Sequence, residues 1–156
     1  MITLSLNKEY NKLVFTYLTF WENDDKTEYI CGVLSVDIQG FPIEYRFSEK
    51  IILDEQQKIF YGTALKKYIV TKVIGEQIIS VLDSAPDFII VEEEELLAIR
   101  GSTKIPVLLF ESTNTDELSY DGLDDHIELY EKIPTTLITM NQVEPFLRLK
   151  EAINYS

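Results

Sequence analysis

Acidic side chains at the ends of β-type runs are the residues of this chain that could do chemistry. Asp37 closes one such run, and Glu92 opens a row of four acids that follows another. Carboxylates that meet at one edge of an α/β sheet can hold two divalent metals, one on each side of a scissile phosphate. One hypothesis is therefore a metal-dependent phosphodiesterase or nuclease built around Asp37 and Glu92.

A second group of acids lies between residues 111 and 131, where eight carboxylates occur without a lysine or arginine. The whole chain carries a net charge of −13. Such a field repels phosphate backbones and attracts basic protein surfaces, so we expect a basic protein partner and no direct binding of nucleic acid. The predicted partner-binding residues are Asp116, Glu117, Asp121, Asp124, Asp125 and Glu128. Alternatives are a solvated loop and an acidic mimic of nucleic acid that acts as an inhibitor.

Other chemistry finds less support. The spacing around Gly122 and Glu128 follows a calcium loop, but Glu117 stands where the first ligand is usually Asp. His126 is the only histidine, which excludes a multi-histidine metal site, and a triad that uses it lacks a nucleophile elbow. Cys31 is the only cysteine and lies in a β-type run, so we expect a buried, inert thiol. There is no glycine-rich phosphate loop, and we predict no cofactor, no resident metal and no catalytic residue.

The elements that must position these residues begin with three strands. Residues 13–21, 29–37 and 43–47 are rich in β-branched and aromatic residues. In the third run Ile43, Tyr45 and Phe47 alternate with polar residues, which predicts one buried and one wet face. A helix is predicted over residues 55–82, because acids precede a broad apolar arc there.

The second half of the chain has a different pattern. Residues 88–91, 107–110 and 136–139 are short continuous apolar runs, typical of strands covered on both faces. A short helix is predicted over residues 92–101, and a last helix from Asn141 to about Ile153. We expect a single domain over residues 1–156 with an acidic loop at 111–133. The fold class is α/β (α+β): a mixed sheet with a three-stranded antiparallel meander, a long helix and then βαβ units.

This order resembles that of ribonuclease-H-like nucleases. The resemblance implies a carboxylate in the middle of the first strand, and residues 13–21 contain none. Hydrophobic residues make up 46% of the chain, but no apolar run approaches the ~18 residues of a membrane span. The first residues lack the features of a signal peptide, so we expect a cytoplasmic protein without membrane contact.

Two motifs carry a further resemblance. The sequence Gly-Phe-Pro-Ile-Glu-Tyr-Arg at residues 40–46 is followed by Tyr-Gly-x-x-Leu-x-x-Tyr at residues 61–68. This pattern, over residues 31–110, is similar to an uncharacterised family of small prokaryotic proteins, which implies a bacterial or archaeal source and no nameable activity. The leading hypothesis is a non-catalytic protein-binding subunit or adaptor of a multi-protein prokaryotic system, such as one for defence or toxin neutralisation. The sequence does not indicate an oligomeric state.

Overall fold

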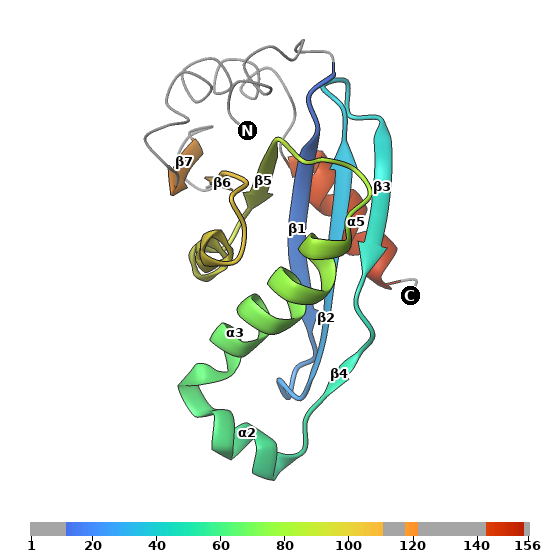
Figure 1. Ribbon diagram of the computed structural model, residues 1–156. Helices are drawn as coiled ribbons and strands as arrows, with labels where there is room; N and C mark the ends of the chain where they lie inside the picture. The colour runs from blue at the N-terminus through green and yellow to red at the C-terminus, as the bar shows by residue number, and fades with distance from the viewer. Residues whose placement is uncertain (1–11, 111–117, 122–142, 155–156) are drawn as a thin grey trace.

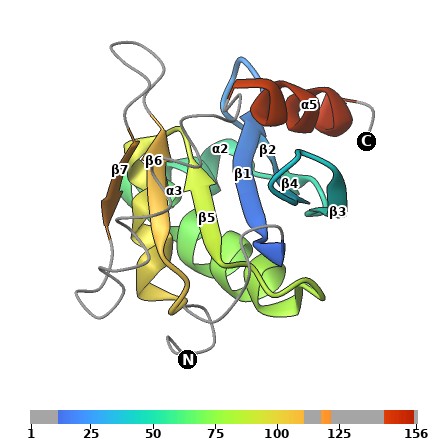
Figure 2. The ribbon, with the colours of Figure 1, turned by 90° about the horizontal axis from the view of Figure 1, so that it is seen from above.

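The computed structural model describes residues 12–110, 118–121 and 143–154. Its centre is a twisted mixed sheet, with a long helical segment on one face and the last helix on the other (Figures 1 and 2). The sheet order is β3-β2-β1-β5-β6-β7. The strands are β1 (Phe15–Glu22), β2 (Glu28–Val36), β3 (Pro42–Phe47), β4 (Ile51–Ile52), β5 (Phe88–Val91), β6 (Val107–Phe110) and β7 (Leu118–Asp121).

Strand directions confirm the predicted fold class. Strands β1, β2 and β3 form an antiparallel meander, and the short β4 continues along the same side of β2 as β3. Strand β5 is parallel to β1 and β6 is parallel to β5, whereas β7 runs antiparallel to β6. The three-stranded meander, the helical segment and the parallel strands follow one another in a ribonuclease-H-like order.

The predicted helix over residues 55–82 is present but interrupted. Its parts are α2 (Glu55–Tyr61), η2 (Gly62–Ala64), α3 (Leu65–Tyr68), the π-helical η3 (Ile69–Ile78) and η4 (Ile79–Val81). Helix α2 begins with a capping box, in which Asp54 and Gln57 exchange side-chain and backbone hydrogen bonds. It ends at Gly62, whose φ of 50° lies in the left-handed region that glycine tolerates best.

The core has two layers, one on each face of the sheet. Apolar side chains of α3 and η3, such as Ile69 and Ile74, pack on one face. Phe146, Leu149 and Ile153 of α5 (Val143–Asn154) pack on the other. Helix α5 lies over β1 and β2. It packs tightly on Gly32 of β2, where an added Cβ would come within 2.8 Å of Ile153 Cδ1.

Several sequence predictions need adjustment. The predicted helix at residues 92–101 is the 3-10 segment η5 (Glu94–Gly101). Part of the predicted acidic loop at 111–133 is strand β7, which has no counterpart in the sequence prediction. The strand predicted at 136–139 and the N-cap Asn141 lie outside the described residues. Among the helices that are described, none combines the length and the apolar character that crossing a membrane requires.

Candidate functional site

The structure separates the two carboxylates on which the phosphodiesterase hypothesis rests. Asp37 follows the end of β2, beyond the pairing of Val36 with Phe15 at the start of β1. Glu92 follows β5, beyond the pairing of Val91 with Leu18. Because β2 is antiparallel to β1 and β5 is parallel to it, the two acids lie at opposite ends of the sheet. A rise of ~3.3 Å per residue puts them roughly 15 Å apart along the strands. The predicted Asp37–Glu92 pair is not one site.

Asp37 has a structural role in the β2–β3 turn. Its Oδ1 accepts hydrogen bonds from the amides of Gln39 and Phe41, both at 2.9 Å. Gly40 takes a φ of 85° in the same turn. An Asx-type turn of this kind occupies the carboxylate with local backbone donors and fixes the entry into β3.

Glu92 belongs to a small polar group at the carboxyl ends of β1 and β5. Lys150 of α5 places Nζ 2.6 Å from Glu92 Oε1. Thr19 of β1 donates a long hydrogen bond of 3.4 Å to the same oxygen. Lys150 therefore takes, at Oε1 of Glu92, the place that a metal ion would need. In the part of the chain that the structure describes, no three His, Cys, Asp or Glu side chains gather as a metal site would need.

A pocket of about 330 Å³ adjoins this group. Strand β5 pairs with β1 only as far as Leu18, so residues 19–22 of β1 have no strand beside them on that side, and the pocket lies there. The pocket is lined by Thr19, Phe20, Trp21 and Glu22 of β1 and by Lys150, Ile153 and Asn154 of α5. We call it the β1–α5 notch. Trp21 and Lys150, which line it, were not among the residues that the sequence predicted for a site, although Trp21 is the only tryptophan of the chain.

Most of the predicted partner-binding acids cannot be compared with the structure. Asp116, Glu117, Asp124, Asp125 and Glu128 lie outside the described residues. Asp121 lies in β7, opposite Val107 of β6. The hypothesis of a basic-partner surface at residues 111–131 and that of a nucleic-acid mimic therefore both stay predictions.

Cys31 is confirmed as a buried residue. Burial raises the pKa of its thiol to about 12, against the smaller lowering effect of a hydrogen bond with Ser48. A thiol that stays protonated at neutral pH is a poor nucleophile. Cys31 is thus part of the core on the helical face of the sheet.

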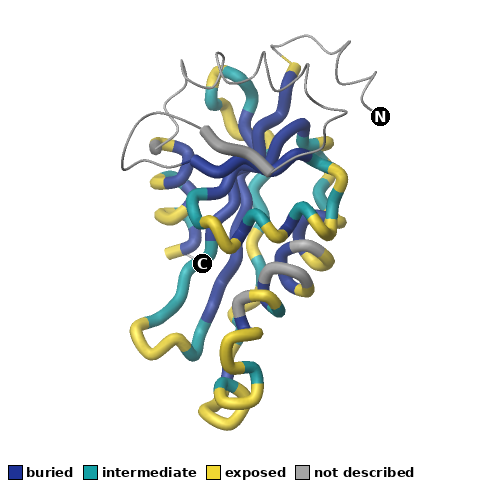
Figure 3. Tube along the Cα trace, turned by 90° about the vertical axis from the view of Figure 1, so that its left-hand side faces the viewer, coloured by how far each residue is buried: buried dark blue, intermediate teal, exposed yellow. Residues whose placement is uncertain are grey.

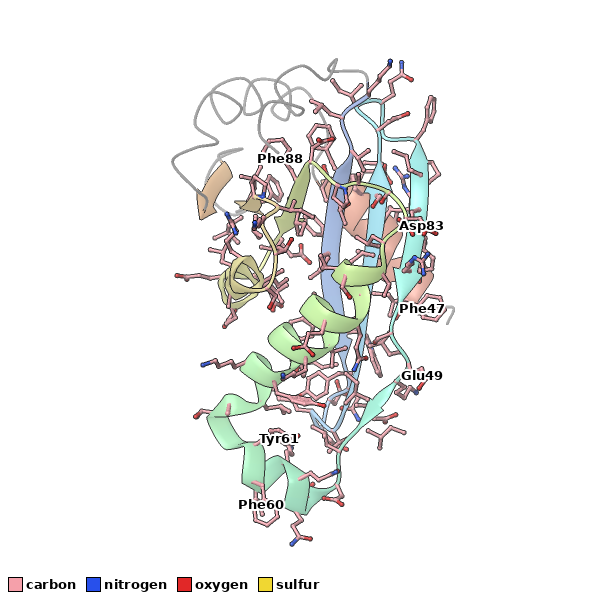
Figure 4. All side chains as sticks on the ribbon, in the orientation of Figure 1. Phe47, Glu49, Phe60, Tyr61, Asp83 and Phe88 are labelled. Carbon is pink, nitrogen blue, oxygen red and sulfur yellow. The ribbon has the colours of Figure 1, made fainter. Side chains whose placement is uncertain are left out.

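The outer edge of the meander carries a second candidate surface. Large apolar side chains are exposed there, at the β2–β3 turn and along β3 and β4, and again on α2. Figure 3 shows that the trace of α2 is largely exposed, and Figure 4 labels Phe47 on β3 and Phe60 on α2. We call this surface the apolar edge; its members are Phe41, Ile43, Phe47, Ile52, Ile59 and Phe60. The predicted burial of one face of β3 is wrong for two of its residues, because Ile43 is 48% and Phe47 is 49% exposed. Helix α5 packs mainly on β1 and β2.

The polar residues of β3 are also placed differently from the prediction. Glu44 was expected to face water, but its side chain is only 10% exposed. It accepts hydrogen bonds from the amides of Asp83 and Ser84, at 3.0 and 2.9 Å, and from the Ser84 hydroxyl at 2.7 Å. Arg46 Nε lies 2.5 Å from the same carboxylate and Arg46 Nη2 lies 2.8 Å from Asp83. This cluster ties β3 to the end of the helical segment (Figure 4).

The pKa of Glu44 follows from that cluster. Burial alone would raise it, but hydrogen bonds from Arg46, from the Ser84 hydroxyl and from the two backbone amides lower it to about 2. The carboxylate is therefore ionised at neutral pH and holds β3 in place as a rigid, preformed edge.

Comparisons with known proteins give a limited result. No protein-family model matches the chain, and no curated protein matches it in sequence. A crystal structure of Endonuclease V from Bacillus subtilis is similar with a TM-score of 0.41 and 16% identity, over 66% of this chain and 45% of that one. Marinitoga piezophila Argonaute in complex with guide RNA has a TM-score of 0.35 and 15% identity, over 65% of this chain and 16% of that one.

Endonuclease V of Ciona intestinalis in complex with a 24mer DNA has a TM-score of 0.36 and 7% identity, over 80% of this chain and 56% of that one. The chain thus spans little more than half, or less, of the solved proteins it resembles. Two of these structures hold nucleic acid, which overturns the expectation that direct nucleic-acid binding is excluded. That expectation rested on net charge alone, and net charge does not describe the local surface that a strand of nucleic acid would meet.

Proposed function

We propose that this chain is a protein-binding subunit that takes up an extended segment of a partner protein along the β3–β4 edge. The observation that carries the proposal is the apolar edge itself. Phe41, Ile43, Phe47 and Ile52 are exposed along one open side of the sheet. An open edge with apolar side chains is the arrangement to which another polypeptide adds a strand.

The main chain of the edge is available for pairing. In the described part of the chain, β3 and β4 each pair only with β2. Their outer side therefore presents backbone donors and acceptors that a partner strand can use. The Glu44 cluster holds β3 from the opposite face, so that little order has to be gained on binding.

The side chains of the edge supply the apolar part of the contact. Phe47 also lines a hollow of about 300 Å³, together with Arg46, Gln77, Ile78 and Val81. Full burial of a Phe or Ile side chain contributes roughly 1.5–3 kcal/mol, so burial of the half-exposed Ile43 and Phe47 contributes on the order of 1 kcal/mol each. At the tip, Ile59 and Phe60 of α2 are both 76% exposed and extend the surface beyond the sheet (Figure 4).

The partner is a different protein rather than a second copy. Each copy carries a net charge of −13, and two such chains repel one another at the close distance of strand pairing. We therefore propose a partner that is not itself acidic and that carries apolar side chains at alternate positions of an extended segment. A place in a multi-protein prokaryotic system, as the sequence motifs suggest, is part of the same proposal.

The test compares co-purification from native cell extract for the tagged chain and its variants. Ile43→Lys and Phe47→Lys place charge on the edge, and each should release the partner. Leu147→Lys is the matched control, because Leu147 is 58% exposed on α5 and is not part of the edge. The partner identified with the native chain must then bind in purified form. Amides of residues 42–47 should exchange with solvent more slowly in that complex. A partner retained by both edge variants, or one that leaves these amides unprotected, would refute the proposal.

The alternative, a metal-dependent phosphodiesterase, needs a site other than the Asp37–Glu92 pair. Glu92 follows the carboxyl end of β5, and it is paired with Lys150. Cleavage of DNA or RNA with Mn²⁺ that is lost in Glu92→Gln would favour this alternative over the strand-binding proposal. Activity that persists in Glu92→Gln would have to use other residues or a contaminant.

A further inference from the structure

We infer that the hollow beside β3 is a specificity pocket for one large apolar side chain, such as leucine or phenylalanine, of the segment that adds to the edge. The inference rests on the proposed function and deepens it, because it names which residue of the partner is recognised and where. This hollow of about 300 Å³ lies between β3 and the end of the helical segment, and we call it the β3–η4 hollow. Its lining is Arg46, Phe47, Gln77, Ile78 and Val81.

The ladder between β2 and β3 decides which backbone groups of the edge face outward. Opposite residues of an antiparallel pair alternate between those that exchange hydrogen bonds and those that do not. The Ser48 amide donates to the Cys31 carbonyl at 2.7 Å, one position beyond the pairing of Phe47 with Gly32. Phe47 is therefore not hydrogen-bonded to β2, and its amide and carbonyl point away from that strand. An added strand would pair with them there.

The same register fixes which side chain of the added strand meets the hollow. Arg46 lies opposite Val33, whose side chain packs in the core on the helical face of the sheet. Residues that lie side by side on neighbouring strands point to the same face. The partner residue beside Arg46 therefore points to the helical face, where Ile78 and Val81 belong to the lining of the hollow. This holds for a parallel and for an antiparallel added strand, and the residues before and after point to the opposite face.

The chemistry of the lining favours an apolar occupant. Ile78 is buried and Val81 is 50% exposed, so an apolar side chain that covered Val81 would remove its surface from water. Arg46 already has two carboxylates, with Nε 2.5 Å from Glu44 and Nη2 2.8 Å from Asp83. An acidic side chain would meet those two negative charges, and a basic one would lie beside Arg46. A volume of about 300 Å³ is at the small end of ligand sites and suits one side chain.

The probe in the test is a library of random peptides displayed on phage, which is selected on the purified chain and on its variants. Val81→Trp and Gln77→Trp fill the hollow from two exposed positions of its lining. Ser80→Trp is the matched control, because Ser80 is exposed next to Val81 and does not line the hollow. Ile43→Lys changes the edge at a residue outside the hollow. Thermal melting checks that each variant folds.

We expect the peptides selected on the native chain to share a large apolar residue at one position. On Val81→Trp and on Gln77→Trp this position should change to a small residue, whereas Ser80→Trp should give the native preference. Replacing the shared residue by alanine in a synthetic peptide should weaken binding to the native chain by about tenfold, and should weaken binding to Val81→Trp far less. The Phe47 amide should exchange with solvent more slowly in the peptide complex, because it faces the added strand.

The possible results separate this inference from the proposed function. Peptides that are lost with Ile43→Lys but keep the same large apolar residue on Val81→Trp and on Gln77→Trp would overturn the inference and leave strand addition at the edge intact. A charged residue at the shared position would overturn it in the same way. If no peptide is selected, or if the selected peptides bind Ile43→Lys as tightly as the native chain, strand addition itself is wrong and the inference fails with it.

Discussion

Replacement of Glu44 by Gln tests whether the edge strand is held by a charged cluster. Gln keeps one carbonyl oxygen, which can still accept from Ser84 at one end of the side chain. Its amide nitrogen then replaces the oxygen that faces the Asp83 amide and Arg46 Nε, at 3.0 and 2.5 Å. The Asp83 amide and Arg46 Nε, both donors, would then face the Gln amide nitrogen, which is also a donor, and the negative charge of residue 44 would be lost.

The size of the effect follows from two estimates. Hydrogen bonds to a charged group contribute about 1.5–3 kcal/mol in mutational series. The pKa of Glu44 is lowered from 4.5 to about 2. At ~1.4 kcal/mol for each pKa unit, this shift gives an upper bound of roughly 3.5 kcal/mol. Solvent screening near the partly exposed Arg46 reduces that bound, so we expect Glu44→Gln to lower the free energy of unfolding by about 2 kcal/mol at pH 7.

The stabilisation by Glu44 should depend on pH in a defined direction. A carboxylate whose folded pKa lies below its unfolded pKa stabilises the protein above the unfolded value, and this stabilisation disappears as the pH falls through the folded value. For Glu44 the window runs from pH 4.5 down to about 2. Urea unfolding of native chain and variant should therefore differ by about 2 kcal/mol at pH 7 and by clearly less at pH 3. Glu49→Gln, an exposed neighbour, should change neither value. A difference below 0.5 kcal/mol at pH 7 (about the accuracy of the assay), or one that stays constant down to pH 3, would refute the reasoning.

Three further predictions concern stability and reactivity. Gly32→Ala should lower the free energy of unfolding by roughly 1 kcal/mol, because the added Cβ would meet Ile153 Cδ1 at 2.8 Å. Ile153→Val removes that Cδ1 atom, so in urea unfolding it should cost less stability in the Gly32→Ala variant than in the native chain. Cys31, with its pKa raised to about 12 by burial, should resist alkylation at pH 8 until urea unfolds the chain, and mass spectrometry after iodoacetamide would expose any native-state reaction. Asp54→Ala should remove the capping box and cost about 1 kcal/mol, with faster amide exchange in α2, whereas Glu55→Gln should have a much smaller effect.

The sequence pattern predicted best those elements that are buried along their whole length. Strands β5 and β6 have the predicted bounds, because each is a continuous apolar run buried on both faces. The long helical segment was also recognised from its apolar arc. Its interruption at Gly62 was not, since a glycine inside a helical pattern does not by itself reveal a positive φ. Strand β7 was missed because its four residues lie within an acidic segment that is typical of loops.

The candidate sites were harder to predict, for reasons of geometry. Asp37 and Glu92 both close β-type runs, but only the pairing directions reveal that those runs end at opposite edges of the sheet. The alternation of Ile43 and Phe47 correctly indicated a strand with two different faces. It could not indicate that α5 packs mainly on β1 and β2 while Ile43 and Phe47 stay exposed, because the coverage of β3 depends on a helix a hundred residues away in the chain. The notch depends on three elements at once, and no local pattern encodes such a meeting.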